Sequence, residues 1–332
     1  MNQTQLTAED LTQQLGIQLP SAEQPLNLTW RNENDVRVWV KRDDLIHPVI
    51  SGNKWRKLSQ TLLHSAHAPP AKIISFGGGH SNHLHALAYS CQKLEIPLLA
   101  IVRGDYSQHM TPMLRDIKHW GAEIEWVNKI TYAKRAYANY LEQLNALHPN
   151  SLIIPEGGSQ LDALNGVAST VAEFTQPYDV IVTPVASGGT MAGLIQGTHN
   201  SRCQVLGLGV LKGHDYLQEL VTRLLPSEIQ HSGSSIQKPT EQKSWQINSD
   251  FHFGGYAKKT PELVTFCEQF EQDYQIPIEP IYSGKLFWGL RQLIENKSFP
   301  PGCKILAIHT GGLQGKRVQQ PAKIIRNQDA VD

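Results

Sequence analysis

Two lysines stand one helical turn apart directly after a glycine–asparagine pair. They belong to the segment 51–58, which reads SGNKWRKL. Gly52 and Asn53 are a typical turn or helix start, so we expect Lys54 in the first turn of the helix that follows. A helix N-terminus and burial both disfavour an ammonium group, and both therefore favour the neutral amine that a Schiff base requires. Lys57 is the rival for this role, and the plainer alternative is that both lysines are surface cations.

A glycine-rich turn lies between a predicted buried strand and a predicted helix of small residues. Residues 187–190 read SGGT. Gly188 and Gly189 let successive backbone N–H groups converge, and the hydroxyls of Ser187 and Thr190 add donors. The helix N-terminus adds positive potential, so the turn suits a phosphate group. It lacks the lysine of a P-loop and the GxGxxG glycine spacing of a dinucleotide-binding fold. The alternative is that this segment is an ordinary tight turn between a strand and a helix.

Three glycines and a Ser-Asn-His sequence follow another predicted strand. Residues 76–85 read FGGGHSNHLH, and the amides and hydroxyl around Ser81 and Asn82 suit a carboxylate. The three closely spaced histidines, His80, His83 and His85, are candidate metal ligands. No nearby cysteine or carboxylate completes a ligand set, so we expect no metal here. The alternative is that Ser81 caps a helix and the histidines are exposed or hydrogen-bonded.

Short apolar runs alternate with amphipathic stretches along most of the chain. The predicted strands are 36–40, 72–76, 97–102, 123–127, 151–154, 180–184, 204–210 and 304–308. The predicted helices are 81–94, 111–120, 132–147, 163–174, 191–197, 216–225, 261–274 and 285–295. This alternation is typical of parallel sheets with helices on both faces. The polar segment 226–246 has little periodicity and reads as a surface loop.

Composition narrows the class of protein. A chain of 332 residues suits two packed α/β domains. The 30 basic residues balance 30 acidic ones, so no net field favours nucleic acid or an anionic membrane. The apolar runs are too short for a membrane span, and the first twenty residues lack the features of a signal peptide. The cysteines form no CxxC pair, and together these features predict a cytoplasmic protein.

Six short motifs occur in one order along the chain. They are KRDDL at 41–45, SGNKWRKL at 51–58, SNH at 81–83, SGGT at 187–190, YSGK at 282–285 and HTGG at 309–312. Together they resemble the 1-aminocyclopropane-1-carboxylate deaminase/D-cysteine desulfhydrase family of tryptophan-synthase-β-like pyridoxal-phosphate enzymes, also called fold type II. The resemblance spans about residues 28 to 315, nearly the whole chain.

The resemblance implies two open parallel-sheet α/β domains with the active site between them. Residues 1–52 and 162–325 would form the large domain that binds pyridoxal 5′-phosphate. Residues 53–161 would form a small inserted domain, and residues 326–332 a C-terminal tail. Because related enzymes are commonly homodimers, we expect a homodimer.

The same resemblance implies the residues that bind the cofactor. Lys54 would hold pyridoxal phosphate as a Schiff base. Asn82 would hydrogen-bond the phenolic oxygen of the cofactor, and Thr310 would lie near its pyridine nitrogen. The phosphate-binding residues would be Ser187, Gly188, Gly189 and Thr190.

The resemblance also implies a catalytic and substrate-binding set. Ser81, Asn82 and His83 would receive the carboxylate of a small amino acid. The catalytic residues would be Lys54, Ser81, Tyr256 and Tyr282. The implied reaction is removal of the Cα proton and loss of a group on Cβ, such as sulfide, which yields pyruvate and ammonia.

Two positions separate the branches of this family. Members that open the cyclopropane ring typically carry Glu after the Tyr of YxGK and Leu after the His of HxGG, where this chain has Ser283 and Thr310. We therefore expect a carbon–sulfur lyase similar to D-cysteine desulfhydrase. The chain departs from the family at His80, where Gln is usual, and at His85, where Arg is usual. Both departures surround the expected substrate pocket.

Other functions stay open at this stage. The enzyme alternatives are 1-aminocyclopropane-1-carboxylate deaminase, a hydrolase, and a lyase or racemase acting on D-serine. A different class is a pyridoxal-phosphate binder with a storage or regulatory role. The joint presence of Lys54, Ser81, Tyr282 and Thr310 argues against a mere binder, because binding alone needs no carboxylate site and no tyrosine.

Overall fold

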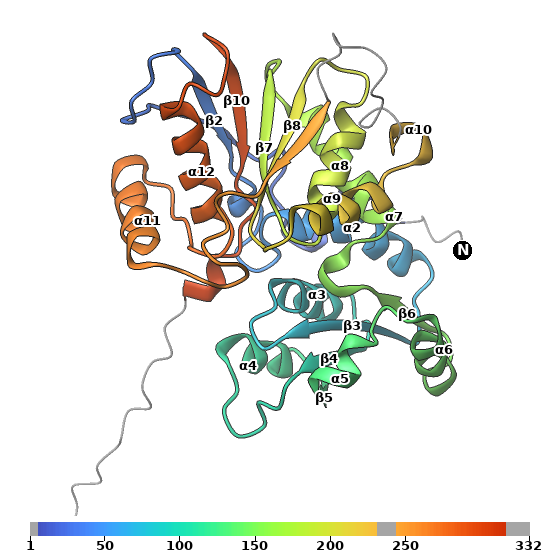
Figure 1. Cartoon of the computed structure of the whole chain (residues 1–332). Coiled ribbons are helices and arrows are strands. Elements are labelled where there is room, and N and C mark those ends of the chain that lie inside the picture. Colours follow the sequence, from blue (N-terminus) through green and yellow to red (C-terminus); the bar gives the residue numbers. More distant parts are fainter. Residues whose placement is uncertain (1–5, 231–243, 317–332) are drawn as a thin grey trace, which may run out of the picture.

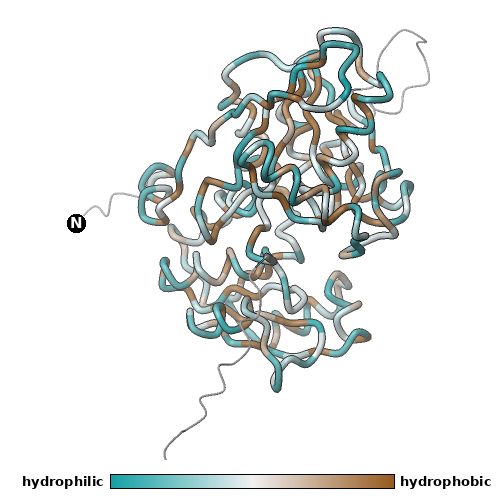
Figure 2. Tube along the Cα trace, turned by 90° about the vertical axis from the view of Figure 1, so that its left-hand side faces the viewer, coloured by the Kyte–Doolittle hydropathy of each residue, from teal (hydrophilic) through white to brown (hydrophobic). Residues whose placement is uncertain are grey.

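Two β-sheets, each flanked by helices, form the body of the protein. The structure is a computed structural model that describes residues 6–230 and 244–316. The larger sheet lies above the smaller one in Figure 1. Apolar segments, brown in Figure 2, run through the interior of both parts. The predicted α/β class with parallel sheets is confirmed.

The larger sheet has six strands. Their order is β1 (Glu23–Leu26), β2 (Arg37–Lys41), β10 (Lys304–Ile308), β7 (Val180–Val185), β8 (Gln204–Gly209) and β9 (Trp245–Asn248). All neighbours are parallel except β1 and β2. One face packs against α11 (Pro261–Tyr274) and α12 (Ser283–Glu295). The other face packs against α7 (Leu161–Ala168), α8 (Gly189–Thr198) and α9 (His214–Leu224).

The smaller sheet is wholly parallel. Its order is β5 (Glu123–Val127), β4 (Leu98–Arg103), β3 (Lys72–Gly78) and β6 (Ser151–Ile154). One face packs against α1 (Ala8–Gln14), α2 (Asn53–His67), α3 (Asn82–Lys93) and α4 (Pro112–His119). The other packs against α5 (Lys129–Ala133) and α6 (Ala138–Leu147). Within the described ranges, no helix is long and apolar enough to cross a membrane.

Helix α2 packs against both parts of the molecule. It contacts α3 beside the smaller sheet and α7 beside the larger one. Its contact with α7 is close because Gly166 has no side chain: a Cβ there would overlap the carbonyl oxygen of Arg56. The proposed boundary at residue 53 therefore falls at the start of a helix shared by both parts. The expected tail, residues 326–332, lies outside the described residues.

All eight predicted strands are present, and three of them match to the residue. Two strands were missed. One is β1, and the other is β9, which begins inside the segment predicted as a loop. That prediction was wrong at both ends, because residues 227–230 form α10 and Trp245 is buried beside β8. Residues 231–243 lie outside the described part.

The predicted helix 132–147 was also wrong as a single element. It is two helices, α5 and α6, separated by residues 134–137. The buried side chain of Tyr132 explains part of the break, since its hydroxyl donates to Glu156 at 2.7 Å. The predicted helix 163–174 ends as α-helix at Ala168 and continues as a 3₁₀ helix, Ser169–Glu173.

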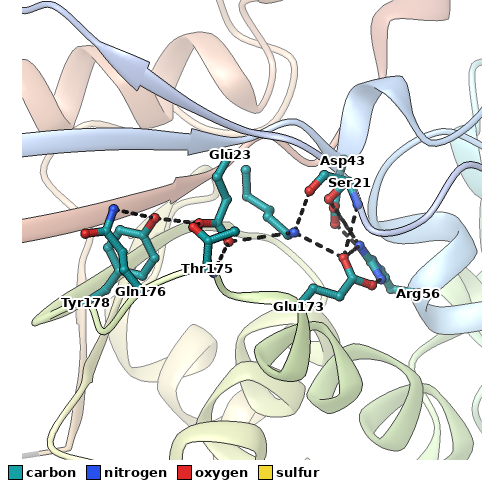
Figure 3. A network of polar contacts seen from close by, with 9 residues as sticks. Ser21, Glu23, Asp43, Arg56, Glu173, Thr175, Gln176 and Tyr178 are labelled. Carbon is teal, nitrogen blue, oxygen red and sulfur yellow. Dashed lines mark hydrogen bonds and ion pairs between the residues drawn. The ribbon is translucent and has the colours of Figure 1, made fainter.

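A buried network of charges joins the end of β2 to α2 and to the 3₁₀ helix at 169–173. Figure 3 shows Ser21, Asp43, Arg56 and Glu173 converging at this point. Arg56 lies 2.9 Å from an Asp43 oxygen and also pairs with Glu173. Lys41, whose side chain is fully buried, donates to the Ser21 carbonyl at 2.7 Å and lies 3.1 Å from Glu173. Buried charges are tolerated only when paired in this way.

Glu173, one of the acids of this network, stays ionised. Burial alone would raise the pKa of the Glu173 carboxyl. The hydrogen bonds and charges of Arg56 and Lys41 outweigh that effect and hold the pKa below its usual value. The network is therefore ionic at neutral pH.

Replacing Arg56 by methionine tests the importance of this network. The substitution leaves Asp43 and Glu173 buried without their main partner, so we expect a loss of about 3–5 kcal/mol in the free energy of unfolding. Urea unfolding followed by circular dichroism measures it. The matched control is Arg223→Met, which removes an exposed pair with Glu219 and should cost no more than about 1 kcal/mol. Equal losses in the two variants would contradict this account of the network.

Candidate active site

Gly52 sets the position of Lys54. Its backbone has φ +63°, and a Cβ there would overlap the carbonyl oxygen of Thr310. Its N–H donates to the Asp43 carbonyl at 2.8 Å. Helix α2 begins at the next residue, so the prediction that Lys54 lies in the first helical turn is confirmed.

The amine of Lys54 is half-buried, and its pKa is lowered. Its Nζ donates to Oδ1 of Asn53 at 2.6 Å. Burial lowers the pKa of Lys54 to about 8. The fraction of neutral, nucleophilic amine near neutral pH is therefore far larger than for an exposed lysine, as a covalent link to an aldehyde requires.

Lys57 reaches the turn that was predicted to bind phosphate. Its buried Nζ lies 3.2 Å from Oγ of Ser187, 3.0 Å from Oγ of Ser159 and 3.0 Å from the Gly157 carbonyl oxygen. Burial, together with the charge of Lys54, lowers the pKa of Lys57 to about 7. Sequence reasoning treated Lys57 only as a rival for Lys54. Their spacing of three residues, which puts both on one helix face, could have indicated a shared site.

The predicted phosphate turn has the expected form. Gly188 has φ +80° and precedes the first residue of α8, Gly189. The first N–H groups of a helix lack partners within it, so they are available to an anion. A Cβ at Gly189 would lie only 2.8 Å from Oγ of Ser159 and 3.0 Å from Nζ of Lys57, so the hollow depends on glycine. Thr190 accepts a hydrogen bond from Asn53 Nδ2 at 2.7 Å, which joins the turn to the residue that holds Lys54.

The segment after β10 brings Thr310, Asn82 and Tyr282 together. The Thr310 carbonyl accepts from the N–H of Asn53 at 3.3 Å. Two residues later, Gly312 has φ +91°, and a Cβ there would lie 2.9 Å from Asn82 Nδ2 and 3.9 Å from the Tyr282 ring. The predicted cofactor residues therefore lie around one point, between the starts of α2, α3 and α8.

Ser81 and His83 flank Asn82 but differ in their surroundings. Ser81 caps α3, where its Oγ accepts from the N–H of Leu84 at 3.2 Å. His83 is buried, and its Nε2 lies 2.8 Å from Oγ of Ser75, which itself donates to the Ile154 carbonyl at 2.8 Å. Ser75 must therefore accept from His83, which leaves Nδ1 unprotonated. Burial and the charges of Lys54 and Lys57 lower the pKa of His83 to about 3, so the ring is neutral.

The other two histidines of this region differ in their surroundings. His80 is exposed. His85 is fully buried, with Nε2 2.8 Å from Asp116 on α4 and its ring against Trp120. The expectation that both departures surround the substrate pocket was wrong for His85. Its side chain serves the packing of α3 on α4, because alternate helical positions face different neighbours.

The two predicted tyrosines form a hydroxyl pair. Tyr282 donates to the hydroxyl of Tyr256 at 3.2 Å, and their rings meet edge-on at 6.2 Å. Tyr256 is 52% exposed, whereas Tyr282 is more enclosed. Burial and the neighbouring Tyr256 raise the pKa of Tyr282 well above its usual value, so Tyr282 holds its proton at neutral pH.

Glu279 is a buried acid that sequence reasoning missed. Its carboxylate accepts the N–H groups of Ile281 at 2.7 Å, Tyr282 at 2.9 Å and Ser283 at 2.9 Å. Burial raises the pKa of Glu279 to about 7, although these hydrogen bonds oppose the rise. Ser283 in turn accepts the Glu279 N–H at 2.9 Å through its Oγ. An acid just before a predicted helix start could have indicated this capping role.

Comparison with known proteins gives a consistent set of relatives. Residues 22–311 match the model of a family described as pyridoxal-phosphate-dependent enzymes. A putative 1-aminocyclopropane-1-carboxylate deaminase of Pyrococcus abyssi is 30% identical, covering 85% of this chain and 86% of that protein. A bifunctional D-cysteine desulfhydrase/1-aminocyclopropane-1-carboxylate deaminase of Arabidopsis thaliana is 28% identical, with coverage of 90% and 78%. A D-cysteine desulfhydrase of Klebsiella pneumoniae is 23% identical, with coverage of 92% and 97%.

Solved structures agree with these sequence relatives. A homologue of 1-aminocyclopropane-1-carboxylate deaminase superposes with a TM-score of 0.75 at 28% identity, covering 92% of this chain and 95% of that one. A serine racemase of Dictyostelium discoideum superposes with a TM-score of 0.61 at 17% identity, covering 93% and 99%, and supports the fold alone.

The residues present fit pyridoxal phosphate. A half-buried lysine of lowered pKa suits the aldehyde. The hollow at Gly189, which a Cβ would fill, suits the phosphate, with Lys57 as a cation at its wall. Both features lie on one side of α2, joined by Asn53.

Lys57 predicts that binding of a phosphate ester depends on pH. Above a pH of about 7 the amine must take up a proton before it can pair with a dianion, so the dissociation constant should rise up to tenfold per pH unit. Calorimetric titration between pH 7 and 9 with pyridoxine 5′-phosphate, which has no aldehyde, separates this effect from linkage to Lys54. The control is Lys57→Met, which should bind more weakly and with little dependence on pH. The same slope in both proteins would exclude this role.

Proposed function

The chain belongs to the family of pyridoxal-phosphate-dependent enzymes, and within it we propose a lyase that eliminates the β-substituent of a small amino acid, with D-cysteine as substrate. The overall reaction converts D-cysteine and water to pyruvate, hydrogen sulfide and ammonia. Two D-cysteine-active relatives support this proposal by name, those of Arabidopsis and Klebsiella.

The proposed cofactor residues follow from the contacts around α2. Lys54 would carry the covalent link, because its amine is the accessible one of lowered pKa. Lys57, Ser187 and the start of α8 would hold the phosphate. Asn82 would face the phenolic oxygen, and Thr310 the pyridine nitrogen. A threonine hydroxyl cannot hold a pyridinium as a carboxylate does, so the ring would stay largely unprotonated.

The proposed chemistry assigns the remaining residues. Pyridoxal phosphate, when bound, withdraws electrons from the Cα of an attached amino acid. Ser81 and the first N–H groups of α3 would bind the substrate carboxylate. The Lys54 amine, displaced by the substrate amine, would take the Cα proton. The hydroxyl pair of Tyr256 and Tyr282 would donate a proton to the departing sulfur.

The observation that carries the choice of substrate is the environment of Ser283. This position would bear a carboxylate in ring-opening relatives. Here its hydroxyl is buried and accepts from the N–H of Glu279. The Glu279 carboxylate accepts three N–H groups of its own turn. None of the residues proposed to contact the cofactor ring therefore carries a carboxylate. This favours loss of a good leaving group from Cβ over cleavage of a carbon–carbon bond.

The second candidate is 1-aminocyclopropane-1-carboxylate deaminase. The names of the Pyrococcus relative and of the solved homologue favour it. Ring opening differs from β-elimination because the Cα of the substrate bears no hydrogen. It also demands stronger electron withdrawal, which a protonated pyridine ring supplies.

We also propose that the protein is a cytoplasmic homodimer, as the sequence analysis predicts. Light scattering after size-exclusion chromatography tests the oligomeric state.

The covalent link should depend on Lys54 alone. Borohydride reduction of the yellow holoprotein should fix the cofactor on Lys54, and intact mass with peptide mapping identifies the residue. Lys54→Ala should abolish the link, because no other neutral amine is placed to form it. Lys57→Ala is the matched control and should retain the link at saturating cofactor. A reduced adduct that survives in Lys54→Ala would move the assignment elsewhere.

The substrate choice is decided by kcat/KM for three compounds: D-cysteine, L-cysteine and 1-aminocyclopropane-1-carboxylate. We expect kcat/KM for D-cysteine to exceed that for the cyclopropane substrate by at least a factor of about 100. Sulfide leaves readily, and no carboxylate is among the residues assigned to the cofactor ring. Released keto acid is the measured product. A preference for the cyclopropane compound would establish the second candidate, and Ser283→Glu would then be expected to raise its rate further.

A further inference from the structure

Lys285 is a fully buried lysine that none of the assigned roles uses. Its Nζ donates to three backbone carbonyls: Gly255 at 2.8 Å, His252 at 2.9 Å and Val210 at 3.4 Å. It makes no ion pair among the residues that the structure describes. Burial lowers the pKa of Lys285 to about 8, and the charge of Glu279 opposes this shift, so the ammonium form still predominates at neutral pH. Burying an ammonium costs free energy unless its hydrogen bonds are satisfied, and here all three donors have an acceptor.

Two of the carbonyls held by Lys285, those of His252 and Gly255, belong to the loop that presents Tyr256, and the third, that of Val210, directly follows β8. That loop has an unusual backbone, with positive φ at Phe253 (+52°), Gly254 (+88°), Gly255 (+117°) and Ala257 (+55°). Two of these are not glycine, so the conformation is disfavoured in isolation and must be imposed by contacts. The ammonium bonds a carbonyl just before this stretch and one inside it.

Helix α12 connects the loop to the second tyrosine. Tyr282 is its N-cap residue and Lys285 lies three positions further along the helix. Helical side chains lean toward the N-terminus, which directs Lys285 back toward the turn of Tyr282. A cation is disfavoured at a helix N-terminus, so its presence here calls for compensation by the carbonyls and by Glu279. One helix thus places one tyrosine directly and the other through an ammonium.

We propose that Lys285 is a positioning residue that clamps the loop 252–257, so that the hydroxyl of Tyr256 stays beside that of Tyr282 during turnover. The effect on turnover rests on the proposed function, whereas the clamp itself does not. Loss of the ammonium releases the loop, and the hydroxyl pair then loses its fixed geometry. Binding of the cofactor should be unaffected, because the clamp lies on α12 and the contacts proposed for the phosphate lie on α2 and α8.

Hydrogen–deuterium exchange tests the clamp without any assay of activity. In holoprotein carrying Lys285→Met, amides of residues 252–257 should exchange at least tenfold faster than in the unchanged protein. The matched control is Lys41→Met, which also removes a fully buried ammonium that binds a backbone carbonyl but lies in another part of the fold. In Lys41→Met, the amide exchange rates of residues 252–257 should stay within threefold of those in the unchanged protein. Unchanged exchange in Lys285→Met, or equal acceleration in both variants, would overturn the clamp.

A double-mutant cycle tests the link to Tyr256. Lys285→Met should lower kcat for D-cysteine at least tenfold, with cofactor affinity within threefold. In a Tyr256→Phe background the same substitution should lower kcat less than threefold, because the group it positions is already missing. An equal loss in both backgrounds would overturn the positioning role.

A second variant keeps the test decisive if Lys285→Met does not retain cofactor, and the exchange measurement keeps it decisive if the protein does not act on D-cysteine. Lys285→Gln keeps two N–H donors without the charge, and it should give intermediate exchange and kcat values. It replaces Lys285→Met if that variant does not retain cofactor. If the unchanged protein does not act on D-cysteine, the proposed function fails, and the exchange measurement still decides whether Lys285 holds the loop.

Discussion

The backbone of Gly52 packs directly against the carbonyl group of Thr310, and this contact leaves no space for a side chain. It brings the start of α2 to the carboxyl end of β10, the third strand of the larger sheet. The Asp43 carbonyl holds Gly52 from the other side. Since Lys54 follows two residues later, this contact fixes its amine at the end of the sheet, where parallel α/β folds bind ligands.

Lys54 and Lys57 of α2 are both buried to some extent, but their surroundings suit them to different proposed roles. Burial lowers the pKa of both, and the charge of Lys54 contributes to the lowered pKa of Lys57. Lys54 gains a neutral amine for covalent chemistry. Lys57, surrounded by Ser159, Ser187 and the Gly157 carbonyl, is best placed to regain its charge when an anion arrives. Proton uptake at one lysine would then help to keep the other neutral.

The tyrosine side of the site is built on α12. Glu279 accepts the N–H groups of the turn that leads into this helix, Tyr282 is its N-cap residue, and Lys285 reaches from it to the loop of Tyr256. Ser283, at the position that separates branches of the family, is occupied in the same turn. A glutamate proposed at this position in ring-opening relatives would therefore also change the hydrogen bonding of a helix start.

Much of this protein was determined locally by the sequence. The apolar runs at 123–127, 151–154 and 304–308 gave strands with those bounds, and the pair Gly52-Asn53 gave the helix start at Lys54. Short motifs also predicted the family and its cofactor, because glycine turns and capping residues act on their immediate neighbours. Strand order, the antiparallel β1 and the edge strand β9 could not be predicted, since they depend on which distant segments pair.

Only the tertiary structure decided the tasks of several side chains. Lys57 reaches the turn proposed to bind phosphate through contacts with residues 100 and 130 positions away in the sequence. His85 turned to Asp116 and away from the presumed pocket, although it lies only two residues from His83. Lys285 found three carbonyls that no motif relates to it. In each case the sequence supplied a charged or polar group, and burial against distant backbone determined its partner, protonation and role.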